Sequence, residues 1–171
     1  MEYPIVANEP MQPWLEGLPL DGSHPIPARL RQLLSRGIVS RDGGLFFAAE
    51  LPSDERLAEL GLTDFSTVEL EGFINKVSLH NLKPTLRTVP GSNAWVYECL
   101  AIAISFGRAI LEACAAISPA TVEVVVSLDF GEDIEYPTGT FRFSSVGADG
   151  VAWSRHPDDY EQAVLTIRRG E

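Results

Sequence analysis

The residues of this 171-residue chain best suited to chemistry are carboxylates, and they gather toward its C-terminal end. From Ala109 to Phe141 the sequence holds no lysine or arginine. Carboxylates this close together project a negative potential, because no cation lies between them to offset it. Four acids and one tyrosine of this stretch are the candidate partner-binding residues: Asp129, Glu132, Asp133, Glu135 and Tyr136.

Three interpretations of this acidic stretch stay open. It is a solvated hairpin tip that keeps the chain soluble, a divalent-cation loop, or a docking surface for a basic protein. Carboxylates suit calcium or magnesium, but the spacing lacks the alternation and the closing glutamate of an EF-hand loop. Nearby aromatic residues offer interface anchors, with ordinary packing on a sheet face as the alternative: Phe130, Tyr136, Trp153 and Tyr160.

Patterns for other site chemistry are missing from the sequence. There is no G-x-G-x-x-G or G-x-x-x-x-G-K-[ST] phosphate loop and no G-x-S-x-G nucleophile elbow. His24, His80 and His156 are scattered beside turn or loop residues, so no zinc pattern is present. Cys99 and Cys114 lie among alanine, leucine and isoleucine, which disfavour a reactive thiolate. We therefore predict no catalytic residue, no cofactor and no metal site.

An N-terminal arm at residues 1–27 holds six of the twelve prolines. Proline fixes φ and removes a backbone donor, so we expect the arm to be neither helix nor central strand. Its apolar residues, among them Trp14 and Leu15, favour an extended arm docked on the core over a flexible tail. Residues 28–171 form an α+β core, and no boundary divides residues 1–171 into two domains.

Three segments carry helix signals. Pro27 opens a short helix that Gly37 ends, and Ser53 is the N-cap of a second short helix. In Ala94–Ile117 the polar residues form one narrow stripe, so this segment is expected to be a central helix packed on most sides. Its longest run without a charge, Cys99–Gly107, is far shorter than the ~18 residues of a membrane span.

The segment Phe65–Leu82 fits both a helix and a strand. Ser66 and Glu69 have the spacing of a capping box, which favours a helix. Apolar and polar residues alternate on either side of Gly72, which favours a strand with a bulge at that glycine. We favour the bent strand.

Alternating or compact apolar runs predict the strands. Thr121–Phe130 and Thr138–Val146 are expected to pair as an antiparallel hairpin, with Leu45–Ala49 and Ala163–Ile167 as further strands. The predicted class is α+β: a single domain with an antiparallel or mixed sheet packed against the long helix at about 94–117, and two shorter N-terminal helices.

The net charge of the chain indicates which classes of partner it can bind. The chain has 24 acidic and 13 basic residues, and the last third (121–171), with ten acids and four bases, carries −6 of the net −11. Such a chain is a poor ligand for a phosphate backbone, so no nucleic acid is expected as a partner. The N-terminus has no basic, apolar signal segment, and we expect a cytoplasmic protein without a membrane partner.

These observations favour a non-enzymatic protein-binding module with an acidic face. Its most concrete form is an immunity or antitoxin protein that neutralises a basic toxin such as a nuclease. One alternative is a small enzyme in which Asp129, with Glu123 or Glu98, acts as general base or divalent-metal ligand. A structural or scaffold subunit is the second alternative, and the sequence does not set the oligomeric state.

Overall fold

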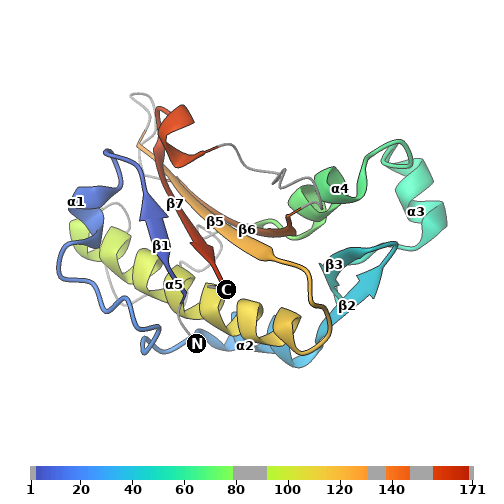
Figure 1. Cartoon of the computed structure of the whole chain (residues 1–171), viewed down its shortest axis with the longest axis horizontal. Coiled ribbons are helices and arrows are strands. Elements are labelled where there is room, and N and C mark those ends of the chain that lie inside the picture. The colour runs from blue at the N-terminus through green and yellow to red at the C-terminus, as the bar shows by residue number, and fades with distance from the viewer. Residues whose placement is uncertain (1–2, 79–91, 131–137, 147–155, 170–171) are drawn as a thin grey trace.

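The chain folds into a five-stranded antiparallel sheet with one long helix across one face, as the computed structural model in Figure 1 shows. The structure describes residues 3–78, 92–130, 138–146 and 156–169. The strand order is β1-β7-β5-β6-β4, and the bounds are β1 Ile5–Ala7, β4 Val77–Ser78, β5 Val122–Asp129, β6 Thr138–Ser145 and β7 Ala163–Arg168. The predicted α+β class is confirmed.

The long helix α5 (Asn93–Ala115) begins where the Ser92 hydroxyl accepts a hydrogen bond from the Trp95 backbone amide, at 3.2 Å. By length and composition α5 is the one helix among the described residues that meets the criteria for crossing a membrane, and most of it is buried inside the molecule, as in a core helix. At Gly107 a Cβ would lie 3.1 Å from Val124 Cγ1, so glycine lets the helix approach the sheet closely.

The strands bury the apolar residues that the alternation predicts. In β5, Val122, Val124, Val126 and Leu128 are at most 3% exposed and belong to the core that includes α5. The expected hairpin of β5 and β6 is confirmed, and its last described pair is Asp129 with Thr138. β7 lies on the other side of β5 and is antiparallel to it.

The N-terminal arm packs against this core. β1 pairs with β7, and Met11 is completely buried. Contrary to the expectation that the arm holds no helix, Gln12–Leu15 forms the short helix α1. Pro13 is compatible with it because the first turn of a helix has no internal partner for the missing N–H.

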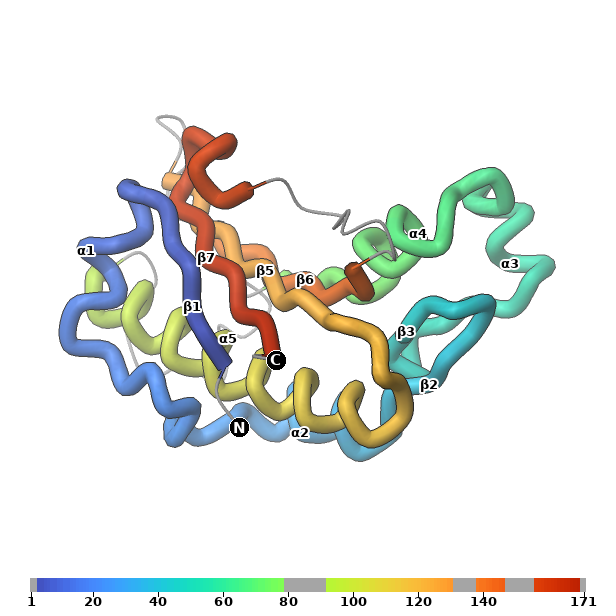
Figure 2. Tube along the Cα trace, in the orientation of Figure 1, coloured from blue at the N-terminus to red at the C-terminus, as the bar shows by residue number. Residues whose placement is uncertain are grey.

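Four further elements lie at the opposite end of the molecule from α1 (Figure 2). There a small antiparallel sheet of β2 (Ile38–Arg41) and β3 (Gly44–Phe47) lies beside α3 (Asp54–Glu59) and α4 (Thr67–Ile74). The two predicted short helices are confirmed as α2 (Ala28–Ser35) and α3.

The strand predicted within Phe65–Leu82 is wrong in its first half. Thr67–Ile74 is helical, and the capping box is present: Glu69 N–H donates to Ser66 Oγ, and Ser66 N–H donates to Glu69 Oε2 at 2.8 Å. Only the two residues of β4 are extended. The helical form is stabilised by Glu71 of α4 and by its C-cap residue Asn75, because their side chains hydrogen-bond to strands on both sides.

Candidate functional site

The face of the sheet that points away from α5 is largely polar. Successive residues of a strand point to opposite faces, so Ser127 and Asp129 lie on the face opposite Val126 and Leu128. The register of β5 and β6 sets Ser127 beside Thr140. Hydroxyl and charged side chains of neighbouring strands therefore share one surface.

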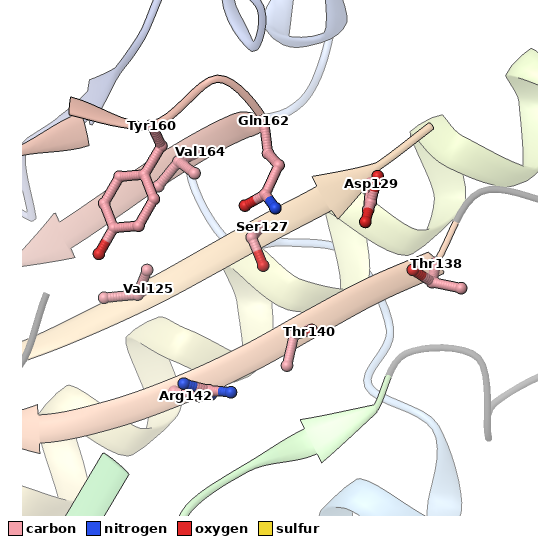
Figure 3. Close-up of a pocket in the computed structure, with 9 residues that line it drawn as sticks. All are labelled: Val125, Ser127, Asp129, Thr138, Thr140, Arg142, Tyr160, Gln162 and Val164. Carbon is pink, nitrogen blue, oxygen red and sulfur yellow. The ribbon is translucent and has the colours of Figure 1, made fainter. Parts of the chain in front are cut away.

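This surface contains a cavity of about 250 Å³ (Figure 3). Two of its side chains come from the segment before β7: Tyr160 and Gln162. Figure 3 shows Arg142 and Tyr160 toward one end of the cavity and Asp129 toward the other. The lining residues are Val125, Ser127, Asp129, Thr138, Thr140, Arg142, Tyr160, Gln162 and Val164.

Burial lowers the pKa of Arg142, the arginine that lines this cavity. Arg142 lies half-buried, and the loss of hydration lowers the pKa of its guanidinium, an effect that the nearby Tyr160 opposes. An arginine remains charged at neutral pH despite such a shift. Arg142 thus brings a cation to this cavity, close to Tyr160.

Asn8 holds the segment that carries Tyr160 and Gln162. Its side chain is 1% exposed, and its Nδ2 donates to the backbone oxygens of Pro157, Tyr160 and Gln162 at 3.1, 3.2 and 2.7 Å. Its Oδ1 accepts from Val164 N–H at 2.9 Å. The N-terminal arm therefore fixes one wall of the cavity.

An aromatic stack joins the arm to the end of β5. Trp14 and Phe130 are stacked with ring centroids 5.2 Å apart, and Tyr97 of α5 meets Trp14 edge-on at 5.7 Å. Phe130 remains 42% exposed. The stack brings an apolar surface next to Asp129.

Six described carboxylates lie on three segments, 8–18, 127–130 and 156–162. The stack and the Asn8 hydrogen bonds join these segments, and none of them contains a lysine or arginine. Asp129 is half-buried and the other five acids are exposed. We call this surface the acidic end, and its described carboxylates are Glu9, Glu16, Asp129, Asp158, Asp159 and Glu161.

Of the predicted partner-binding residues, only Asp129 is described, and it lines the cavity. Tyr160, proposed from the sequence as an interface anchor, lines it too. The other predicted positions, Glu132, Asp133, Glu135 and Tyr136, lie outside the described residues, as does the proposed anchor Trp153.

Sequence reasoning missed Arg142, Ser127 and Asn8 as residues of this region. The alternation in β6 and the serine that follows the valine run of β5 indicate a polar face, but only the register brings those side chains together. Asn8 carries no local signal, because its partners lie about 150 positions away.

The carboxylate pairs considered for an enzyme are not brought together. Glu123 is bound by Arg168, whose Nε and Nη2 lie 2.6 and 2.5 Å from Glu123 Oε2. It lies six residues from Asp129 along β5, about 20 Å away. Glu98 lines a different cavity with His24 and Arg31.

The two cysteines are buried in α5 as free thiols. Burial, with a smaller contribution from Glu98, raises the pKa of Cys99 to about 12. Burial, with a smaller contribution from Glu71, raises the pKa of Cys114 to about 12. Neither thiol is therefore ionised at neutral pH, which disfavours the thiolate that a cysteine nucleophile needs.

Searches of protein-family models, curated proteins and solved structures found no match to this chain.

Proposed function

We propose that this chain is a non-enzymatic protein-binding module whose acidic end captures a basic protein. Its most concrete form is an immunity or antitoxin protein that neutralises a basic toxin such as a nuclease. One observation carries the proposal: six carboxylates, five of them exposed, gather on three joined segments that contain no lysine or arginine. The acidic loop residues Glu132, Asp133 and Glu135, with Tyr136, are proposed as part of the same surface.

Electrostatics link this surface to a nuclease. A protein that binds nucleic acid needs a positive surface to neutralise phosphates. A surface rich in carboxylates competes for that same positive surface and raises the rate of encounter. The partner is therefore a basic protein, while nucleic acid and membrane are not partners. Neutralising a nuclease before it reaches cellular nucleic acid places the chain in the cytoplasm.

The aromatic stack supplies the apolar part of an interface. Binding energy in protein interfaces is concentrated in a few aromatic and arginine residues that are surrounded by polar groups. Phe130 is 42% exposed, and its stacking on Trp14 limits the rotamer freedom that binding would otherwise have to remove. A partner arginine placed on the open face of Phe130 would lie next to Asp129.

Charge reversal tests the proposal. Where a gene adjacent to the one for this chain encodes a basic protein, that protein is the probe. The test variant is Glu9→Lys/Asp158→Lys/Glu161→Lys. The matched control, Glu50→Lys/Glu55→Lys/Asp64→Lys, changes the net charge equally at exposed positions elsewhere. We expect the test variant to associate about tenfold more slowly at low salt, and the difference to shrink as salt rises.

A growth assay provides the functional readout. The wild-type chain and the control variant should relieve the toxicity of the co-expressed partner, and the test variant should relieve it poorly. Equal association rates for the test and control variants would show that the acidic end is not the docking surface. An adjacent gene product that neither binds this chain nor is toxic would overturn the proposal that the chain neutralises a toxin.

A further inference from the structure

We infer that the cavity on the open sheet face is a binding site for a small carboxylate whose other end carries N–H or O–H donors. This inference goes beyond the proposed function and does not depend on it, because the site takes a small molecule and needs no protein partner. It rests on three features of the cavity: the hydrogen-bonding groups along its floor, the charges at its ends, and its size.

The floor and one wall of the cavity offer hydrogen-bonding groups that the described residues do not use. The side chains of Ser127, Thr138, Thr140 and Gln162 make no hydrogen bond within the described residues. Ser127 and Thr140 are register partners on β5 and β6, and Asp129 and Thr138 are the next pair along the same face. A ligand lying along the strands would meet a donor or an acceptor on each pair.

The charges differ between the two ends. Arg142 is the register partner of Val125, and Asp129 lies four residues further along β5. Figure 3 shows the two side chains toward opposite ends of the cavity. A guanidinium binds a carboxylate through paired N–H groups, and an aspartate accepts from ammonium or hydroxyl groups. The cavity is therefore complementary to a ligand with a carboxylate at one end and donors at the other.

Strand geometry sets the length of the ligand. Four residues of a strand span about 13 Å, and strand side chains stand roughly perpendicular to the sheet. A hydrogen-bond length of about 3 Å at each end leaves about 7 Å. Two extended amino-acid residues cover that length, since each spans about 3.3–3.6 Å. One sugar ring with a carboxylate substituent is of comparable size, and the Tyr160 ring at the cavity wall suits its C–H face.

The inference is tested by an NMR titration of the isotope-labelled full chain with two probes, alanylalanine and glucuronic acid. The backbone amide signals of Ser127, Thr140 and Gln162 report binding. Two further compounds lack the carboxylate: alanylalanine amide and glucose. We expect at least one carboxylate probe to give saturable shifts in the millimolar range, with its counterpart that lacks the carboxylate binding at least about tenfold more weakly. The probe that binds assigns the ligand as a peptide or as a sugar acid.

Two variants locate the site. Arg142→Gln removes the cation, and Thr140→Val removes a cavity hydroxyl with little change in volume. Both should weaken binding of the carboxylate probe, whereas Thr121→Val, at an exposed position outside the cavity, should leave it unchanged. The inference is overturned if neither probe saturates, if the counterparts without a carboxylate bind equally well, or if neither Arg142→Gln nor Thr140→Val weakens binding. None of these results requires or affects the proposed protein partner.

Discussion

At the scale of single residues, Glu71 joins the two sheets. Its side chain is completely buried, and Oε1 accepts from Leu45 N–H of β3 at 2.6 Å. Oε2 accepts from the backbone amide and the hydroxyl of Ser145 in β6, at 3.0 and 2.6 Å. One carboxyl group therefore satisfies donors of two strands that do not pair with each other.

We predict that Glu71→Gln destabilises the protein by about 1–3 kcal/mol. An amide has one acceptor oxygen, so its NH₂ group would face a buried backbone N–H that needs an acceptor. Urea unfolding measures the loss. The control is Glu69→Gln on the same helix, which keeps the exposed capping-box pattern and should change the free energy of unfolding far less. Equal stability of the two variants would contradict this role of Glu71.

The pH dependence of the same variant follows from its burial. Loss of hydration raises the pKa of Glu71 above its ordinary 4.5, although the hydrogen bonds from Ser145 and Leu45 oppose the shift. A raised pKa means that the folded state holds the proton more tightly, so this stability is fully present below pH 4.5 and is lost as the pH rises through the folded pKa. The glutamine does not titrate. The loss of stability caused by Glu71→Gln should therefore become smaller as the pH rises from 4.5 through the folded-state pKa of Glu71. A loss that grows over this range would mean that folding lowers the pKa of Glu71.

At the scale of elements, α4 shows where sequence reasoning succeeds and where it stops. The capping box of Ser66 and Glu69 is a local signal, and the structure contains it. The alternation that favoured a strand counts Glu71 as a solvent-facing residue, yet Glu71 is buried while Phe73 is 56% exposed. The partners that reverse the pattern lie on distant strands, so no local window contains them. By contrast, α5 and the β5–β6 hairpin have strong local periodicity and were predictable.

The candidate site divides in the same way. Asp129 was predictable because charge clusters are visible along the sequence. The cavity around it was not, because it needs the strand register and the arm, which Asn8 fastens to a segment about 150 positions away.

The attachment of the arm gives an element-scale prediction. Asn8→Ala would leave Val164 N–H and the backbone oxygens of the 156–162 segment without their partner, at roughly 1–3 kcal/mol for each buried group left unsatisfied. Besides losing global stability, the variant should show faster amide hydrogen exchange at Val164 than the wild type. The control is Asn93→Ala, an exposed position at the start of α5, which should change neither quantity appreciably. Unchanged exchange at Val164 would mean that the arm does not hold this segment.

At the scale of the whole molecule, the charge is distributed unevenly. The acidic end gathers six described carboxylates, while α2 and the residue that follows it carry Arg29, Arg31 and Arg36. A surface of one sign destabilises its own fold through repulsion, and evolution retains such surfaces where a partner uses them. An acidic end that serves binding should therefore cost the free protein stability, in a way that salt reduces.

We predict that Glu9→Gln/Asp158→Asn/Glu161→Gln stabilises the free protein at low salt by a few tenths of a kcal/mol per charge. The three positions are exposed, so the gain comes from reduced repulsion and not from packing. Raising the salt shortens the Debye length to about 8 Å at physiological ionic strength and should stabilise the wild type more than the variant. Urea unfolding at low and high salt measures both effects. If the variant is no more stable than the wild type at low salt, the six carboxylates do not act as one repulsive surface, and steering of a basic partner by their combined field loses its physical basis.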